Sequence, residues 1–366
     1  MTVCAVIAEY NPLHRGHLVH LSQIKARLGQ DARLVAVMSG HTVQRGDFPI
    51  LTKTARTRMA LEAGFDLVFE LPAPYACAPA ERFARAAVDI IARLGVVTHL
   101  SFGTETDDLE ALQLLSKRIP DEIPRHKTLA AALPEAFPDA AHLFTPNNIL
   151  ALEYLRALRG KAPGIVPVAV ERRGGFHDGP RGSASAIRGR ALQTGRVPRG
   201  VPFAGIWQAE TRAGRAPVSL ARQEGAVLSH LRRLTLADFL ALPDVGAGGL
   251  AQRLHNAAGQ ARSLEELLQA VKTKRYTMAR LRRCVLAAFL GLTEEMAERP
   301  PHIRLLGIGP AGEAVLSLIE TPILSRPAAH RGALAAEAAV TDQMALCMPV
   351  PEPAGGEWRN GVVVKK

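Results

Sequence analysis

The chain has 366 residues, of which 48% are hydrophobic and 22% charged, a composition typical of a soluble globular protein with one large domain or two ordinary ones. No apolar run approaches the roughly 18 residues of a membrane span, so we expect neither a transmembrane segment nor a signal peptide. The four cysteines are scattered, which argues against structural zinc or a disulfide framework and favours a reducing cytoplasm. The formal net charge of +11 favours a polyanionic partner, with a solvated basic surface as the alternative.

The first predicted element is a buried strand over residues 4–8, whose apolar and partly β-branched side chains suit the interior of a sheet. Asn11-Pro12 ends this run, and a helix follows with apolar residues along one face from Leu18 to Leu28. The first N–H groups of a helix are unpaired and its dipole is positive there. The sequence therefore predicts a phosphate site between the strand and the helix.

The segment His14-Arg15-Gly16-His17 carries side chains that suit a nucleotide. His14 and His17 would lie on the same side of the first helical turn. Neutral imidazoles there can hydrogen-bond phosphoryl oxygens, and a protonated one can offset charge as pyrophosphate leaves. Gly16 has no Cβ, so a base or ribose can approach the backbone. For the tetrapeptide alone, two surface histidines at a helix start are the simpler interpretation.

The position of this tetrapeptide, directly after the first strand, is that of the nucleotidylyl transferases of the His-Ile-Gly-His superfamily. With the flanking Glu9-Tyr10-Asn11-Pro12, the stretch resembles the bacterial tRNA(Met) cytidine acetate ligases, although Leu13 and Arg15 stand where that family has Phe and Asn. The resemblance implies that His14 and His17 are catalytic. It also implies an ATP-binding stretch made of Ile7, Ala8, Glu9, Tyr10, Asn11, Pro12, Leu13, His14, Arg15, Gly16, His17, Leu18, Val19 and His20.

Strands and helices then alternate, which predicts an α/β fold with a Rossmann-like, doubly wound parallel sheet. The expected strands lie at 32–38, 65–71, 96–102 and 165–170, and the expected helices at 54–63, 81–94 and 149–158. Ligands bind at the carboxyl ends of such strands, so the polar loop 39–49 should face the first motif. Candidates in this loop are His41, Gln44, Arg45 and Asp47, with His41 standing where the family has Asn.

Gly103 and the pair Asn147-Asn148 are candidates for the nucleoside side of the site. Gly103 directly follows the strand 96–102, where a plain turn explains a glycine as well as a close approach to adenine or ribose does. The asparagines open the helix 149–158, where N-capping is the simpler alternative. The resemblance implies that Gly103 lines the ATP site and that one asparagine contacts ATP, with Asn147 slightly preferred.

Two later segments predict phosphate contacts. Arg172 and Arg173 follow the strand 165–170 with two glycines, and a guanidinium can chelate two phosphate oxygens. The resemblance implies one such arginine, with Arg172 the first choice. Ser185 and Arg188 begin a helix, where simple capping is the alternative. They resemble the Ser-Ser-Thr-x-Ile-Arg type element, the second signature of the superfamily, in which hydroxyls, a helix N-terminus and an arginine hold the triphosphate.

A segment rich in Gly and Pro at 195–204 predicts a domain boundary. We expect an ATP-binding catalytic domain over 1–200, a mainly α-helical domain over 205–348 and a disordered tail over 349–366. The second domain is expected to contain helices at 219–231, 236–242, 250–260, 264–271 and 277–292, with a strand at 303–308.

The segment 272–283 carries six basic residues and no acidic one. Placed on one helix, four of these cations share a face with an aromatic ring, which suits an RNA backbone with an unstacked base. They are Lys272, Arg275, Arg280 and Arg283, and the ring is that of Tyr276. A solvated helix face is the alternative. The resembling family has a nearly identical Lys-Thr-Lys-Arg-Tyr-Thr segment, so we expect tRNA to be bound by Lys272, Lys274, Arg275, Tyr276, Arg280 and Arg283.

The resemblance implies that ATP activates acetate as acetyl-adenylate and that the acetyl group passes to N4 of the anticodon wobble cytidine of elongator tRNA(Met). Mg²⁺ should accompany ATP, but no sequence feature names its ligands or singles out acetate among small carboxylates. Two other classes stay open: a nucleotidylyl transferase with a small-molecule substrate, and an RNA-binding protein with a degenerate nucleotide site. The long basic helical region argues against the first, and the two paired signatures argue against the second.

Overall fold

The computed structural model describes residues 1–120, 133–134, 136–171, 182–246 and 248–366. Within these residues seven strands form one sheet, in the order β5-β4-β1-β2-β3-β6-β7. The strands are β1 (Val3–Ala8), β2 (Arg33–Ser39), β3 (Leu67–Leu71), β4 (His99–Thr104), β5 (Val166–Glu171), β6 (Leu305–Ile308) and β7 (Val363–Val364). The first five are parallel, whereas β6 runs antiparallel to β3 and parallel to β7. The predicted α/β fold class is confirmed.

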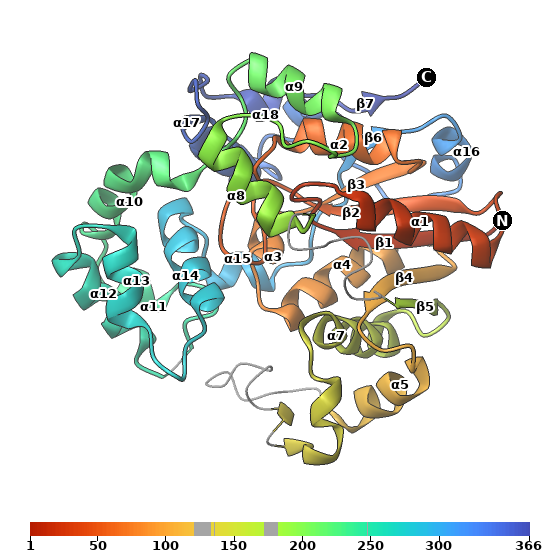
Figure 1. Cartoon of the computed structure of the whole chain (residues 1–366), viewed down its shortest axis with the longest axis horizontal. Helices are drawn as coiled ribbons and strands as arrows, with labels where there is room; N and C mark the ends of the chain where they lie inside the picture. Colours follow the sequence, from red (N-terminus) through yellow and green to blue (C-terminus); the bar gives the residue numbers. More distant parts are fainter. Residues whose placement is uncertain (121–132, 135, 172–181, 247) are drawn as a thin grey trace.

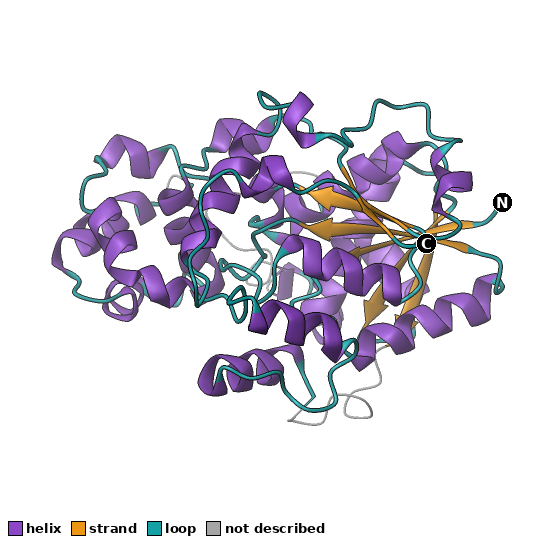
Figure 2. Ribbon diagram, turned by 90° about the horizontal axis from the view of Figure 1, so that it is seen from above, coloured by secondary structure: helices purple, strands orange, loops and turns teal. Residues whose placement is uncertain are grey.

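The central strands β1, β2 and β3 are buried on both faces, which explains why they read as apolar runs. Along β1, Val3 and Ala5 pack in one hydrophobic cluster, and Cys4 and Val6 pack in another on the opposite face. Figure 2 shows helices on both sides of the strands. These helices are α1 (Arg15–Leu28), α2 (Lys53–Glu62), α3 (Ala73–Ala76), α4 (Ala80–Leu94), α5 (Leu109–Arg118), α7 (Pro146–Lys161), α8 (Ala184–Thr194) and α9 (Ala204–Arg212), with the 3₁₀ turn η1 (Pro138–Leu143) before α7.

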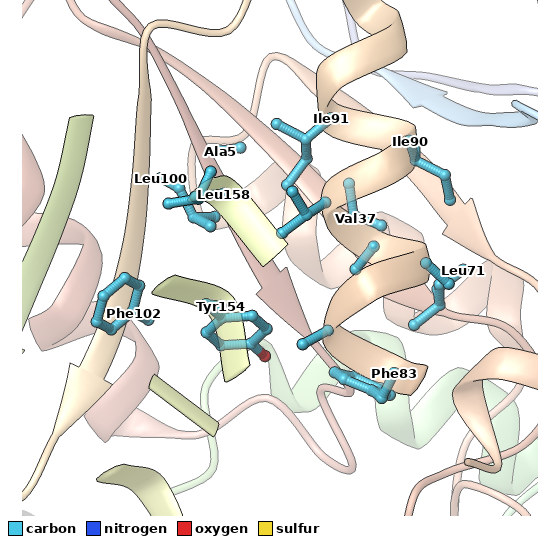
Figure 3. Packing of buried hydrophobic residues seen from close by; sticks show 14 of the residues in the cluster. Ala5, Val37, Leu71, Phe83, Ile90, Ile91, Leu100, Phe102, Tyr154 and Leu158 are labelled. Atoms are coloured by element: carbon cyan, nitrogen blue, oxygen red, sulfur yellow. The ribbon is translucent and has the colours of Figure 1, made fainter. Parts of the chain in front are cut away.

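One face is covered chiefly by α4 and α7. Figure 3 shows Ile90 and Ile91 of α4 in the buried cluster that also holds Leu158 and Tyr154 of α7 and Leu100 of β4. The opposite face is covered by side chains of α1, α2, α8 and α9, including the buried Trp207. The carboxyl ends of β1, β2 and β4 therefore stay open to loops, and these loops build the site.

A helical half (residues 224–298) lies beside the sheet, at the left of Figure 1. It contains α10 (Glu224–Leu231), α11 (Leu236–Leu240), α12 (Leu250–Gln260), α13 (Leu264–Val271), α14 (Met278–Leu290) and α15 (Glu294–Glu298), and the 3₁₀ turn η2 (Leu220–Gln223) precedes it. Its hydrophobic core also includes Phe48, Ala73 and Cys77 from the segments after β2 and β3. The helical half and the sheet thus share buried contacts.

The chain returns to the sheet after the helical half. This last segment contains β6, α16 (Gly312–Leu316), η3 (Pro327–Ala329), α17 (Ala335–Leu346), α18 (Gly356–Arg359) and β7. The expectation of a disordered tail over 349–366 is wrong. Glu357 of α18 is buried against Lys53 and Arg304, and β7 pairs with β6. Among the described helices, none combines the length and apolar character that a membrane crossing requires.

Candidate nucleotide site

The first turn of α1 is fixed by the two histidines of the first motif. His14 is the N-cap, and its Nδ1 accepts from the backbone N–H of Gly16 at 3.1 Å. Nδ1 of His17 accepts from the backbone N–H of His14, also at 3.1 Å. In a neutral imidazole only one ring nitrogen carries hydrogen, so both side chains are held as donors at Nε2. Their ring centroids lie 3.9 Å apart, which confirms that they share one side of the turn.

Tyr10 and Asn11 shape the turn that leads into this helix. Tyr10 is buried in the left-handed region at φ 46°, and its ring meets the His17 ring edge-on at 4.9 Å between centroids. Oδ1 of Asn11 accepts from the backbone N–H of Ile50 at 2.9 Å, which ties the turn to the loop after β2. The peptide bond from Asn11 to Pro12 is cis.

The second signature lies against the first. Ser183 caps α8, and the hydroxyl of Ser185 accepts from Nη2 of Arg188 at 3.1 Å. Nη1 of Arg188 donates to the carbonyl oxygen of Asn11 at 2.6 Å. Nη1 of Arg45 donates to the same Ser185 hydroxyl at 3.0 Å. Two guanidinium groups therefore converge beside the start of α1, and this arrangement suits polyphosphate oxygens.

Burial lowers the pKa of Arg188, and the nearby positive charge of Arg45 lowers it further. Two like charges held this close favour an anion between them. Arg45 belongs to the candidates of the loop 39–49 but not to the ATP-binding residues that the resemblance implied. The sequence feature that pointed to Arg45 was its position in a loop that follows the end of a strand.

Glu9 and Arg56 organise the ends of β1 and β2. Burial raises the pKa of the Glu9 carboxyl, against the lowering effect of the backbone N–H of Gln44, which donates to its Oε1 at 2.7 Å. Nη1 of Arg56 donates to the carbonyl oxygens of Glu9 at 3.0 Å and Ser39 at 2.8 Å, and Nη2 donates to that of Gly40. Sequence reasoning missed Arg56, because a helix arginine gives no sign that its partners are carbonyls at strand ends.

His41 faces away from this chemistry. Its Nε2 accepts from the backbone N–H of Lys53 at 3.1 Å, and its Nδ1 lies 2.9 Å from the Thr341 hydroxyl. Burial and the nearby Lys53 charge lower its pKa well below the ordinary value, so it is a neutral, buried link between the loop and α17. His41 is therefore better explained by packing than by contact with a nucleotide.

The asparagine pair lies beside the end of β4. Oδ1 of the buried Asn148 accepts from the backbone N–H of Glu105 at 2.8 Å. Nδ2 of Asn147 donates to a carboxylate oxygen of Glu105 at 2.6 Å. The two side chains thus fasten the loop that follows Gly103, the half-buried glycine on β4. Arg172 and Arg173, by contrast, lie outside the described residues.

The predicted basic helix face is corrected by the structure. Helix α14 begins only at Met278, so 272–277 is a turn and not part of the helix. Arg280 and Arg283 are buried and both pair with Asp244, while Tyr276 is buried with its hydroxyl donating to the carbonyl oxygen of Gly248 at 2.6 Å. These three side chains do not form an RNA-binding face. The members of the predicted set that are exposed are Lys272, Lys274 and Arg275.

Comparisons with known proteins find one family model and several relatives that cover most of this chain. Residues 1–352 match the family model described as HIGH nucleotidyl transferase. The tRNA(Met) cytidine acetate ligase of Caldicellulosiruptor saccharolyticus is 34% identical, covering 88% of this chain and 86% of its own. That of Acetivibrio thermocellus is 32% identical, with 100% of each chain covered. The crystal structure of Thermotoga maritima TmcAL bound with α-thio ATP is 29% identical, with a TM-score of 0.89 over 100% of both chains.

Proposed function

Since the chain belongs to the tRNA(Met) cytidine acetate ligase family of HIGH nucleotidyl transferases, we propose that it uses ATP to activate acetate and acetylates the wobble cytidine of elongator tRNA(Met). The product is N4-acetylcytidine. The observation that supports this best is the guanidinium of Arg188, which donates both to Ser185 of the second signature and to Asn11 of the first. This contact supports a single site built from both half-motifs of a nucleotidylyl transferase.

The proposed reaction has two steps. In the first, a carboxylate oxygen of acetate bonds to the α-phosphorus of ATP as the bond to the bridging oxygen breaks and pyrophosphate leaves. In the second, the exocyclic amine of the cytidine attacks the acetyl carbonyl carbon, AMP leaves, and the amine gives up a proton. No protein nucleophile is needed, so catalysis depends on positioning and on charge stabilisation.

The residues at the start of α1 suit the first step. The helix N-terminus offers backbone N–H groups to phosphate, and its first turn reads Arg15-Gly16-His17-Leu18 without a carboxylate. His14 and His17 would donate from Nε2 to phosphoryl oxygens, because their Nδ1 atoms already accept backbone N–H groups. Arg45 and Arg188 would hold the departing pyrophosphate.

The nucleoside would lie toward the end of β4, beside Gly103 and Asn147. We keep Asn147 as the preferred asparagine, because the Asn148 side chain is buried, whereas that of Asn147 is only half-buried and can reach a ligand. One of Arg172 and Arg173 would add a phosphate contact.

Mg²⁺ would arrive with ATP and neutralise charge on its phosphates. Among the described residues there is no group of three or more His, Cys, Asp or Glu side chains that could hold a metal ion. We therefore propose that phosphate oxygens and water bind most of the cation, as they commonly bind Mg²⁺ at nucleotides.

The tRNA would contact the turn that precedes α14. Lys272, Lys274 and Arg275 are exposed there, although Nζ of Lys272 also donates to two nearby carbonyl oxygens. Their charges suit the phosphate backbone. Since tRNA is the substrate, we propose that the protein acts in the cytoplasm.

The decisive experiment is nucleoside analysis of tRNA(Met) incubated with the protein, ATP and labelled acetate. We expect label in N4-acetylcytidine, and none when ATP is omitted. ATP–pyrophosphate exchange with other small carboxylates tests the choice of acetate. Label transfer to a small-molecule acceptor in preference to tRNA would instead indicate a cofactor-type nucleotidylyl transferase.

A further inference from the structure

The turn at residues 43–47, between β2 and α2, contacts both halves of the molecule. The N–H of Val43 donates to the carbonyl of Asp47 at 3.1 Å, and the N–H of Gly46 donates to the carbonyl of Val43 at 2.9 Å. Gly46 has φ +75°, and a Cβ on it would overlap the backbone nitrogen of Arg283. Because only glycine permits this backbone and this close approach, the turn packs directly on α14.

Arg283 spans the junction between the helical half and this turn. Its Nε and Nη2 donate to Oδ2 of Asp244 at 2.9 and 2.5 Å, and its Nη1 donates to the carbonyl oxygen of Gln44 at 3.1 Å. The side chain is 9% exposed, and that of Asp244 is 11% exposed. Since the carboxylate fixes one side of a planar guanidinium, the remaining nitrogen is held in place at Gln44.

The same turn contacts the nucleotide site. The N–H of Gln44 donates to Oε1 of Glu9 at 2.7 Å. The next residue, Arg45, donates to the Ser185 hydroxyl at 3.0 Å. Gln44 is therefore held from the helical half by its carbonyl and from the first motif by its N–H. Any displacement of Gln44 would shift Arg45 relative to Ser185.

We infer that Arg283, held by Asp244, is a positioning residue for adenylate formation, and that it acts through Gln44 to keep Arg45 at Ser185. The inference rests on the proposed function for its kinetic test. Loss of the Arg283 donor would leave the Gln44 carbonyl without that partner at a packed junction. A shift of about 1 Å in a group that contacts substrate can cost about 10²-fold in rate.

Arg283→Lys and Asp244→Asn test the inference with small changes in volume. Lysine keeps the charge but cannot donate to Asp244 and Gln44 in the fixed geometry of a guanidinium. We expect both variants to weaken binding of the ATP analogue α-thio ATP and to lower acetate-dependent ATP–pyrophosphate exchange about 10- to 100-fold. The loss of exchange activity should appear mainly as a lower kcat/KM for ATP, with the KM for acetate nearly unchanged.

Arg82→Met is the matched control. Arg82 of α4 also makes a two-bonded pair across the two halves, with Glu294 of α15 at 2.8 and 2.6 Å. None of its described contacts involves the turn 43–47. Even if Arg82→Met loses as much stability as Arg283→Lys, it should keep exchange activity within about twofold of the wild type. An equal loss of activity in Arg82→Met would overturn the inference, because general docking of the halves would then explain the effect.

A double-mutant cycle with Arg45→Ala identifies the route. If Arg283 acts through Arg45, Arg283→Lys should add little to the effect of Arg45→Ala on α-thio ATP affinity. Additive effects would overturn the inference. The affinity readout needs no acetate or tRNA. A wild-type protein that binds the analogue but shows no acetate-dependent exchange would therefore contradict the proposed function while the cycle still tests the positioning role.

Discussion

Nζ of Lys53, at the start of α2, lies 2.8 Å from Oε1 of Glu357 in the last short helix of the chain, and both side chains are buried. Glu70 of β3 completes the group, 2.6 Å from Lys53 and 2.9 Å from Nη1 of Arg304, which also pairs with Glu357. Two cations and two carboxylates thus neutralise one another between the sheet and the C-terminal helices. A buried group of this kind is costly to leave incomplete.

We predict that Glu357→Ala lowers the free energy of unfolding by about 3–5 kcal/mol, because Lys53 and Arg304 would each lose a carboxylate with which they pair directly and keep their pairs with Glu70. Urea unfolding followed by circular dichroism measures this loss. The control is Glu352→Ala, whose partially exposed carboxylate lies 3.7 Å from Arg215 and whose removal should cost about 0–1 kcal/mol. Equal small losses in both variants would show that the tail does not depend on the buried charges.

Glu337 of α17 predicts a pH dependence of stability. Burial, together with the negative charge of Glu70, raises the pKa of this carboxyl to about 7. Between an unfolded pKa near 4.3 and that value, the folded state binds more protons than the unfolded state, so this group makes stability fall as pH rises. Above about pH 7 its unfavourable effect is fully present.

Glu337→Gln should remove this effect, because an amide resembles the protonated acid and cannot ionise. The stability of the variant relative to the wild type should therefore rise from about pH 5 to about pH 8. Urea midpoints across this range provide the test, with the exposed Glu295→Gln of α15 as the control. A constant difference between Glu337→Gln and wild type at every pH would place the titration at another group.

The helix-capping role of the first motif histidine should be separable from the catalytic role proposed for both. His14→Ala removes the N-cap of α1 and should cost about 0.5–2 kcal/mol of stability, whereas His14→Asn restores a capping oxygen. Both variants lose the Nε2 donor, so both should lower acetate-dependent ATP–pyrophosphate exchange about 10²–10³-fold. His17→Ala should lose as much activity, and the exposed His142→Ala should lose none.

Activity retained by His14→Asn but lost by His14→Ala would mean that the imidazole serves only as a cap. Exchange kinetics and thermal unfolding on the same preparations distinguish the two roles.

Replacement of Lys272, Lys274 and Arg275 by Ala should weaken tRNA binding and leave adenylate formation unchanged. For every phosphate that the protein no longer neutralises, the dependence of log K on log salt should flatten by about 0.7–0.9. Binding titrations at several salt concentrations measure both effects. Replacement of the exposed Lys117 and Arg118 on α5 serves as a charge control. An unchanged salt slope in the triple variant would return this turn to ordinary solvated surface.

Most of the sheet and helices were predictable because their signals are local. The helices expected at 250–260 and 264–271 match α12 and α13 at both ends, and the first five strands lie within a few residues of expectation. The first motif was also readable, since a strand, a Pro turn and a capped helix follow one another directly. His14 and His17 share one side of their turn as the spacing predicted.

What could not be predicted depends on partners distant in sequence. Arg280 and Arg283 look like surface cations in their own segment, and only the fold brings Asp244 to them. The residues after 349 have little apolar periodicity, so nothing local indicates that Glu357 enters a charged core. The strand at 303–308 was expected, but its place beside β3 has no local signal.

The late arrival of β6 affects synthesis of the protein. Strand β3 has its outer edge covered by β6, which the ribosome adds only after the whole helical half. Nascent chains fold from the N-terminus as they emerge, so the first five strands would wait with an open, apolar edge that can pair with a neighbouring chain. The sheet, whose first strands are synthesised before the helical half, is therefore completed only after it. Slow translation between β3 and β6 should consequently favour aggregation.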